Sequence, residues 1–282
     1  MITTLAPGED ATLLAELLER APAWLESGRA QLRVHADTDP DSHESARQAQ
    51  RETKLRAIRA GRAKRYVLEV ETRAGPRVVK IAEVTSLGNH VLGLLGTSIA
   101  RREHAFHARA HALGFAASRS LGFLEWRVGP FLQRACQVQT LIPNEARDLD
   151  HLLVSELARW GDAALEPLAD ALAAMHTKGF FHADLKGFHA FVVARNTLPD
   201  GPQQYDLTWI DLARVGFRLT RRQRLINLYQ ALRFVVPPRP QAQERFMTRY
   251  CAAAVWHAAT PQLALARVQR LLRYKLRTHP HP

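Results

Sequence analysis

The chain has 282 residues, with 39 Lys and Arg against 27 Asp and Glu, which gives a formal net charge of +12. Hydrophobic residues make up 46% of the sequence and charged residues 23%, values that exclude a disordered or collagen-like chain. The length is sufficient for one large domain or two packed lobes. Two cysteines are too few for a disulfide framework or a four-cysteine zinc site, and they fit a reducing compartment.

The hydrophobic pattern predicts a soluble protein of the cytoplasm. No stretch of the sequence approaches the roughly 18 uninterrupted apolar residues of a membrane span, and the first twenty residues lack the basic and apolar regions of a signal peptide. The positive charge favours polyanionic partners in general. A coding bias toward arginine explains the same charge equally well, so the charge alone does not select a partner.

The first part of the chain combines an amphipathic helix with a β-hairpin. Residues 9–27 carry leucines at helical spacing and are predicted to form a helix, whereas the polar run 37–54 fits a loop or an exposed helix. Two β-rich runs within 65–83 flank a turn at 73–76, which predicts a hairpin.

A helix and two further strands are expected next. Thr97 or Ser98 can cap a helix that ends near Gly114, a plausible C-terminal stop. Strand-like runs then cover 120–128 and 130–142. Together with the hairpin they predict a small β-rich lobe that contains one helix.

From Asp148 onward the pattern is mainly helical. Helices are predicted over 148–161 and 164–179, two short strands over 190–195 and 205–212, and further helices from Thr220. The fold class is therefore α+β with two lobes, a smaller β-rich one and a larger helical one. We divide the chain into an N-terminal helical and polar extension, a first lobe and a second lobe, at 1–60, 61–142 and 143–282.

Two acidic residues in the second lobe indicate a site for phosphoryl transfer. Such a site needs a carboxylate that accepts the proton of a substrate hydroxyl, ligands for Mg²⁺ and a cation on the phosphates. Asp184 lies in a loop after a predicted helix, and two predicted strands place Asp211 at a second loop, so their carboxylates can converge. Lys186 would point from the Asp184 loop toward a transferred phosphate. In the first lobe, Lys80 is placed within a strand, where a cation needs a partner, and Glu103 on the next helix can supply it.

These motifs resemble those of the lipopolysaccharide core kinase family, which has a protein-kinase-like fold. The Asp184 loop reads His-Ala-Asp-Leu-Lys, the fifth residue after Asp184 is His189, and Asp211 stands in Ile-Asp-Leu-Ala-Arg. The runs VVKIAE, ARREHAF and QTLIPNEARDLDHLL resemble the small lobe and hinge of the same family. Kinases of this family phosphorylate the inner-core heptose or Kdo sugars of bacterial lipopolysaccharide. The resemblance covers roughly residues 65–235.

The resemblance implies a role for each matching residue of the second lobe. Asp184 corresponds to the catalytic base, with Lys186 beside it. Asp211 corresponds to the main Mg²⁺ ligand, and His189 stands at the position of the second, although imidazole is a poorer Mg²⁺ ligand than a carboxamide oxygen. His182 is expected to brace the metal-binding loop.

In the first lobe, the resemblance implies an ATP-binding site. Lys80 would contact the α- and β-phosphates, and Glu103 would hold Lys80 in place. The backbone of the hinge would face the adenine, near Thr140, Leu141 and Ile142.

Three departures from the protein-kinase pattern bear on the substrate. No glycine-rich loop precedes Lys80, so the turn over the phosphates must come from Lys54–Arg65, where Gly61 offers backbone freedom. Ala183 replaces the arginine that pairs with a phosphorylated activation loop in many protein kinases. A basic helix follows soon after Asp211 and leaves no long activation segment, which favours a glycolipid or small-molecule acceptor over a protein.

We therefore predict an ATP- and Mg²⁺-dependent kinase of a lipopolysaccharide inner-core sugar. Two alternatives stay open: a kinase of another small hydroxylated acceptor such as an aminoglycoside, or a pseudokinase that acts as an adaptor. The basic segments 221–224 and 266–277 fit solvated helix faces or a peripheral contact with the anionic inner membrane. No nucleic-acid partner is expected.

Overall fold

A computed structural model describes most of the chain as two compact units. The first unit contains residues 1–109 and 118–142, and the second contains residues 110–117 and 143–282. The described residues are 2–5, 11–27, 30–33, 44–60, 64–73, 75–84, 98–142, 147–148, 161–185, 190–194, 205–233, 240–254, 256 and 260–278.

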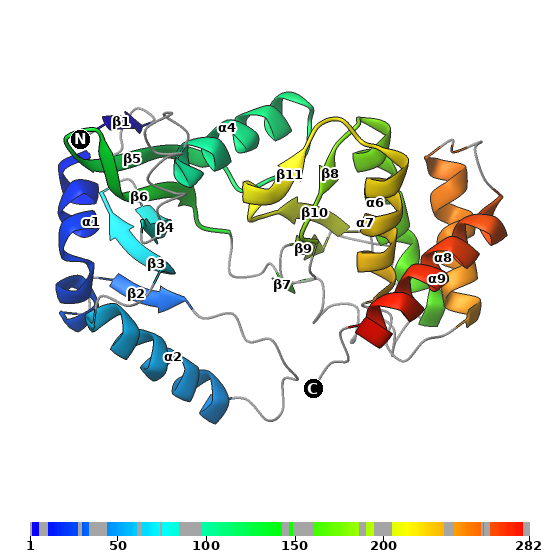
Figure 1. Ribbon diagram of the computed structural model, residues 1–282, viewed down its shortest axis with the longest axis horizontal. Coiled ribbons are helices and arrows are strands. Elements are labelled where there is room, and N and C mark those ends of the chain that lie inside the picture. The colour runs from blue at the N-terminus through cyan, green and yellow to red at the C-terminus, as the bar shows by residue number, and fades with distance from the viewer. Residues whose placement is uncertain are drawn as a thin grey trace. The chain divides into compact units, whose positions relative to one another are not determined.

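The first unit is built on a six-stranded antiparallel sheet in the order β1-β5-β6-β4-β3-β2 (Figure 1). Its strands are β1 (Ile2–Leu5), β2 (Ala30–Arg33), β3 (Arg65–Thr72), β4 (Gly75–Glu83), β5 (Ser120–Val128) and β6 (Phe131–Thr140). Its helices are α1 (Ala11–Glu26), α2 (Glu44–Arg59) and α4 (Ile99–Ala112), the last of which ends in the second unit. The predicted hairpin is confirmed, because β3 and β4 pair from Arg65 opposite Ala82 to Thr72 opposite Gly75.

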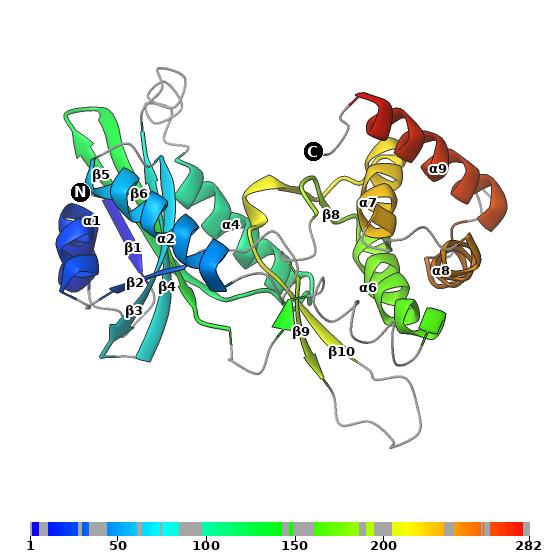
Figure 2. The ribbon, with the colours of Figure 1, turned by 90° about the horizontal axis from the view of Figure 1, so that it is seen from below.

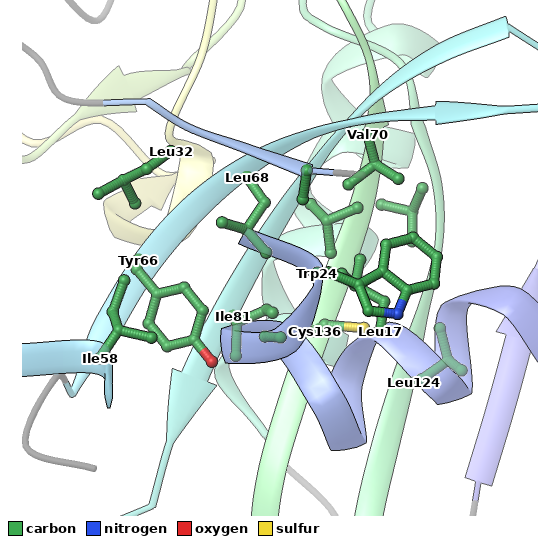
Figure 3. Packing of buried hydrophobic residues seen from close by; sticks show 14 of the residues in the cluster. Leu17, Trp24, Leu32, Ile58, Tyr66, Leu68, Val70, Ile81, Leu124 and Cys136 are labelled. Carbon is green, nitrogen blue, oxygen red and sulfur yellow. The ribbon is translucent and has the colours of Figure 1, made fainter. Parts of the chain in front are cut away.

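One face of this sheet packs against α1 through an apolar core. Leu17, Ala21 and Trp24 recur at helical spacing and are almost fully buried, so the same side of α1 faces the strands. Figure 3 shows Leu17 and Trp24 gathered with Ile81 of β4 and Cys136 of β6. This burial confirms the amphipathic helix that the leucine spacing predicts.

The polar run predicted as a loop or an exposed helix is helical from Glu44 onward, in α2. Its far end carries Ile58, a buried residue that lies beside Tyr66 of β3 (Figure 3). Leu55, one turn earlier, is partly buried and packs against the same core, so the end of α2 is attached to the sheet through apolar contacts. Part of the segment Lys54–Arg65, predicted to supply the turn over the phosphates, is helical as far as Arg59, and Gly61 lies outside the described residues.

The other face of the sheet is covered by α4 (Figure 2). The Ser98 hydroxyl accepts a hydrogen bond from the Arg101 N–H at 3.1 Å, which confirms the predicted cap. Ala100 packs there against Phe123 and Ala135. The helix is followed by Gly114 at φ +73°, a left-handed conformation that glycine adopts without strain.

Strands β1 and β2 were not predicted, and they form the two edges of the sheet. Each has four residues, so the alternation that would indicate a strand is barely repeated. Both lie within residues 1–60, the predicted extension. The three-part division of the chain stays a prediction, and the sheet continues across its first boundary because β2 pairs with β3.

The second unit combines helices with two small antiparallel sheets, β10-β9-β7 and β11-β8. Its helices are α6 (Glu166–Thr177), α7 (Arg221–Arg233), α8 (Pro240–Ala253) and α9 (Pro261–Thr278), with short 3₁₀ turns at Gly161–Leu165 and Leu212–Arg214. Its strands are β7 (Arg147–Asp148), β8 (Phe181–His182), β9 (Ala190–Ala194), β10 (Tyr205–Trp209) and β11 (Val215–Gly216). Helix α6 packs against α8, and α9 packs against both α7 and α8.

The helix predicted over 164–179 is confirmed as α6, after which the chain turns at Gly179, φ +74°. Asp148, predicted as the start of a helix, belongs instead to β7 and pairs with Phe191 of β9. Residues 149–160 of that predicted helix lie outside the described residues. Within the described ranges, no helix has the length and apolar character needed to cross a bilayer.

Candidate active site

Lys80 and Glu103 form an ion pair between β4 and α4. The neighbours of Lys80 in the strand, Val79 and Ile81, point into the α1 core, so alternation turns Lys80 toward α4. Its Nζ donates a hydrogen bond to Glu103 Oε1 at 2.6 Å. The Glu103 side chain is only 6% exposed. The structure thus joins the two residues that the sequence predicted as partners.

Glu103 stays ionised despite its burial. Removal from water raises the pKa of this carboxyl, but the Lys80 ammonium and the His107 ring lower it, and the net result is a pKa of about 2. A buried carboxylate therefore faces Lys80 at neutral pH. A charge in this environment holds the ammonium in one direction, as a phosphate-binding lysine requires.

The predicted hinge follows β6. The Thr140 N–H donates to Arg119 O at 2.9 Å, and its Oγ1 accepts from the Arg119 N–H at 3.1 Å. The backbone donor of Thr140 is therefore engaged within the protein. Leu141 and Ile142 follow it, both partly exposed.

In the second unit, strand pairing brings the two predicted acidic loops together. Strand β8 leads into the loop of Asp184, and β11 follows the turn that begins at Asp211. The two strands pair with His182 opposite Val215, and the Ala183 N–H donates to Arg214 O at 2.7 Å. Arg214 Nη1 also lies 4.0 Å from Asp184 Oδ2. Two loops far apart in sequence thus become neighbours.

Asp211 adopts a left-handed backbone conformation, φ 55° and ψ 54°. Among the described residues it is the only one other than glycine with positive φ. Such a conformation is uncommon outside glycine and costs free energy, and it persists where the surrounding structure enforces it, most often at functional sites. The conformation singles out Asp211 independently of its sequence motif.

The side chain of His182 links the two loops. It is fully buried, and Nε2 donates to the carbonyl of Ile210, the residue before Asp211, at 3.3 Å. This contact confirms the bracing role predicted for His182. The backbone of His182 is held in turn by Asn227 of α7, whose Oδ1 accepts from the His182 N–H at 3.1 Å and whose Nδ2 donates to the His182 carbonyl.

A buried chain of hydrogen bonds supports Asn227 from behind. His176 Nε2 donates to Asn227 Oδ1 at 3.2 Å, so Nδ1 of the neutral ring accepts from the Tyr250 hydroxyl at 2.6 Å. Tyr250 accepts in turn from Arg224 Nη1 at 2.9 Å. Burial, rather than a nearby charge, is the main cause that lowers the pKa of His176 to about 4.

The sequence did not predict a role for Asn227, although it drew an interpretation of the segment just before it. The sequence predicts that the segment RRQR at 221–224 is a solvated basic face or a membrane contact. Arg221 and Arg222 are exposed, whereas Arg224 is bonded to Tyr250 and lies over the Trp256 ring, 5.1 Å from its centroid. Asn227 lies one helical turn beyond Arg224, and no motif marks it in the sequence; its burial and its hydrogen bonds to His182 reveal it in the structure.

Two predicted site residues, Lys186 and His189, lie outside the described residues. Within the described ranges, no three of the His, Cys, Asp and Glu side chains gather closely enough to hold a metal ion. The predicted contacts of Lys80, Asp184 and Asp211 with ATP and Mg²⁺ stay predictions.

The sequence profile of the "Lipopolysaccharide kinase (Kdo/WaaP) family" matches residues 86–258, which is more than half of the chain. The chain belongs to this lipopolysaccharide kinase family. It is therefore a kinase, as the motifs around Asp184 and Asp211 predicted. The match includes Glu103 and both acidic loops, whereas Lys80 precedes it. No curated protein matches the chain in sequence.

Solved structures identify the fold of this lipopolysaccharide kinase family member. The structure described as "WaaP in complex with acyl carrier protein" is similar with a TM-score of 0.56 and 17% identity, over 99% of each chain. This likeness shows the two-lobed kinase-like fold that the sequence predicted. The MAP kinase LmaMPK10 from Leishmania major (TM-score 0.40, 12% identity, 90% of this chain and 66% of that one) is more distant. So is the bifunctional kinase-methyltransferase WbdD (0.41, 17%, 74% and 43%).

Proposed function

We propose that this kinase transfers the γ-phosphate of ATP to a sugar hydroxyl of the lipopolysaccharide inner core, on heptose or Kdo. The observation that carries the proposal is the pairing of β8 with β11, which sets the Asp184 loop beside the left-handed Asp211. Two carboxylates on adjoining, braced loops are the arrangement that phosphoryl transfer to a hydroxyl needs. The family match supports the choice of acceptor class.

Asp184 is the proposed catalytic base. As the bond from the γ-phosphorus to its bridging oxygen breaks, the acceptor oxygen bonds to phosphorus and its proton passes to the Asp184 carboxylate. The hydroxyl must be oriented before it reacts, and the Asn227 contacts to the His182 backbone hold the Asp184 loop for that purpose. Lys186 is proposed to lie beside the transferred group.

Asp211 is the proposed ligand of Mg²⁺, and His189 is a weaker candidate. Carboxylate oxygens are the hard donors that Mg²⁺ prefers, and the enforced backbone of Asp211 fits a residue that must present its side chain in one direction. Bound Mg²⁺ would neutralise charge on the phosphates.

Lys80 is proposed to bind the α- and β-phosphates while Glu103 holds it in place. We place the adenine against the backbone after β6. Because the Thr140 N–H already donates to Arg119, the groups proposed to bond the base are those of Leu141 and Ile142.

Labelled γ-phosphate from Mg²⁺-ATP, offered to dephosphorylated lipopolysaccharide, tests the proposal. We expect label in the glycolipid with the wild-type protein and a loss of at least about 100-fold with Asp184→Asn, because an amide cannot take the proton. Asp170→Asn is the matched control, since Asp170 pairs with Arg249 on an exposed helix surface, and this variant should transfer at the wild-type rate. Full activity of Asp184→Asn would overturn the assignment of the base.

The same assay also tests which molecule is the acceptor. If the wild-type protein labels an aminoglycoside and leaves the glycolipid unlabelled, the acceptor is a different hydroxylated molecule. If ATP raises the melting temperature of the protein and neither acceptor is labelled, the inner-core assignment fails while nucleotide binding stands.

Two partners beyond the acceptor are proposed. The exposed side of α9 carries arginines beside Leu263 and Tyr274, which suits a peripheral contact with an anionic membrane. The WaaP structure was solved with acyl carrier protein, so a carrier protein is a candidate partner of this chain as well. Co-elution of the two proteins in gel filtration would test it.

A further inference from the structure

The face of the sheet that packs against α4 carries polar side chains next to Glu103, and these side chains are buried. In β6, Cys136 and Val138 belong to the α1 core, so alternation turns Gln137 and Gln139 toward α4. Gln137 is 1% exposed and Gln139 is 2% exposed. A buried amide costs free energy unless it is hydrogen-bonded, so each of these two side chains needs partners.

Both amides meet the Glu103 carboxylate. Gln139 Nε2 donates to Glu103 Oε1 at 3.3 Å. With the Gln137 amide turned so that its nitrogen faces the carboxylate, this nitrogen lies 3.0 Å from Oε1 and 3.2 Å from Oε2. Glu103 therefore has Gln139 as a neutral donor from β6 in addition to the Lys80 ammonium, and Gln137 adds a second donor in the turned orientation.

The donors are themselves held in place. The Ser118 hydroxyl donates to Gln139 Oε1 at 3.1 Å, which points the amide nitrogen of Gln139 away from Ser118. His107 of α4, fully buried, donates from Nδ1 to the Ser118 carbonyl at 2.6 Å, and its Nε2 lies 3.2 Å from Gln139 Nε2. These bonds tie α4 to β6 beside the ion pair.

We propose that Gln137 and Gln139 are positioning residues that hold the Glu103 carboxylate, and through it Lys80, in the phosphate-binding arrangement before nucleotide arrives. The proposal rests on the proposed role of Lys80 in binding ATP. Donors to a buried carboxylate lower the cost of its desolvation, and they do so whether or not phosphate is present. The ion pair is thus assembled without bound nucleotide.

Calorimetric titration of Mg²⁺-ATP into Gln139→Leu tests this role. We expect binding to weaken by about tenfold, the usual loss for one hydrogen bond to a charged group. Gln31→Leu is the matched control, because Gln31 is exposed at the edge strand β2, and it should bind as the wild type does.

A double-mutant cycle separates positioning from mere structural support. In a Lys80→Met background, Gln139→Leu should weaken Mg²⁺-ATP binding by less than about twofold, because no lysine remains to be positioned. The same tenfold loss in that background, or no loss in the wild-type background, would overturn the proposal. If the wild-type protein itself binds no Mg²⁺-ATP, the proposed function fails, and the positioning role fails with it.

Gln139→Glu gives an independent readout in case the leucine variant folds poorly. It keeps the shape of the side chain but places a second carboxylate against Glu103, so binding should be weak near about pH 8 and recover toward about pH 5.5, as the added carboxyl is protonated and donates an O–H. The ratio of the binding constants of variant and wild type, measured at each pH, reports the effect. A ratio that does not change with pH would contradict a role through hydrogen bonding.

Discussion

At the residue scale, the second unit relies on buried polar groups to hold its catalytic loop. His176, Asn227 and Tyr250 are nearly inaccessible to water, and His176 bonds both of the others. Asn227 also bonds the backbone of His182 and the side chain of Gln230, and Tyr250 accepts from Arg224. Such networks stabilise one arrangement only while every member keeps its protonation state. A fall in pH that protonates His176 would therefore disturb the hydrogen bonds that hold the catalytic loop.

His176 makes the folded state sensitive to mild acid. Its pKa is about 4 in the folded protein against 6.5 in an exposed chain, so between these values the unfolded state binds more protons than the native state. The free energy of unfolding should fall by up to about 3 kcal/mol from this residue as the pH falls from about 6.5 to about 4.

Urea unfolding at several pH values measures this effect, with His176→Gln as the comparison. We expect the wild-type protein to lose stability more steeply across the window than the variant, which has no group to protonate. Equal slopes for the two proteins would show that His176 is not the responsible group. Glu103 acts in a lower window, because its depressed pKa contributes stability that is lost as the pH falls from about 4.5 toward about 2.

At the element scale, the short pair of β8 and β11 sets the distance between the two loops. Gly216 of β11 lies opposite Phe181 of β8, and a Cβ at Gly216 would collide with the Phe181 ring. Phe181 is followed directly by His182, which braces the Asp211 loop. The absence of a side chain at Gly216 therefore allows the close strand pairing that positions Asp184 and Asp211.

Gly216→Ala should impair phosphoryl transfer by forcing β8 and β11 apart. We expect a stability loss of about 1–3 kcal/mol, as for other overpacked positions, and a lower kcat, measured by thermal unfolding and the transfer assay. Gly129→Ala is a suitable control. Gly129 has φ +57° at the tip between β5 and β6 with open space around it, so that variant should lose about 1 kcal/mol from backbone strain alone and keep its kcat. Normal transfer by Gly216→Ala would disconnect the strand pair from catalysis.

At the scale of the whole molecule, the net charge of +12 is distributed unevenly. Helix α9 carries five basic residues and no acidic one, and Leu263 and Tyr274 are 46% and 61% exposed. These two residues lie three turns apart on one side of the helix, with exposed Arg270 between them. Basic and apolar side chains on one exposed helix face suit the surface of an anionic bilayer.

Sedimentation with vesicles of anionic lipid should detect this contact. Binding should fall by at least about 30-fold in Arg270→Glu/Arg273→Glu, because each of the two basic residues near such a surface contributes about 1 kcal/mol. The control Arg73→Glu/Arg119→Glu makes the same change of net charge at exposed positions of the first unit. An equal loss in both variants would attribute binding to the total charge rather than to α9.

The sequence by itself determined the elements and residues whose signals are local. Leucine spacing predicted α1, β-rich runs around a turn predicted β3 and β4, the loop motifs singled out Asp184 and Asp211, and its position within a strand singled out Lys80. Each of these signals depends on neighbours within a few residues, where the periods of helix and strand apply. Their order along the chain predicted a two-lobed α+β fold, and the resemblance to the lipopolysaccharide core kinase family implied that this fold is kinase-like.

Only the tertiary structure decided which polar residues hold the site together. Gln139 and Asn227 resemble ordinary surface amides in sequence, and they become structural because distant segments remove them from water and pair them with Glu103 and His182. The edge strands β1 and β2 are likewise defined by their partners in the sheet. Desolvation and strand pairing depend on contacts between residues far apart in the chain, so neither is visible in a local pattern.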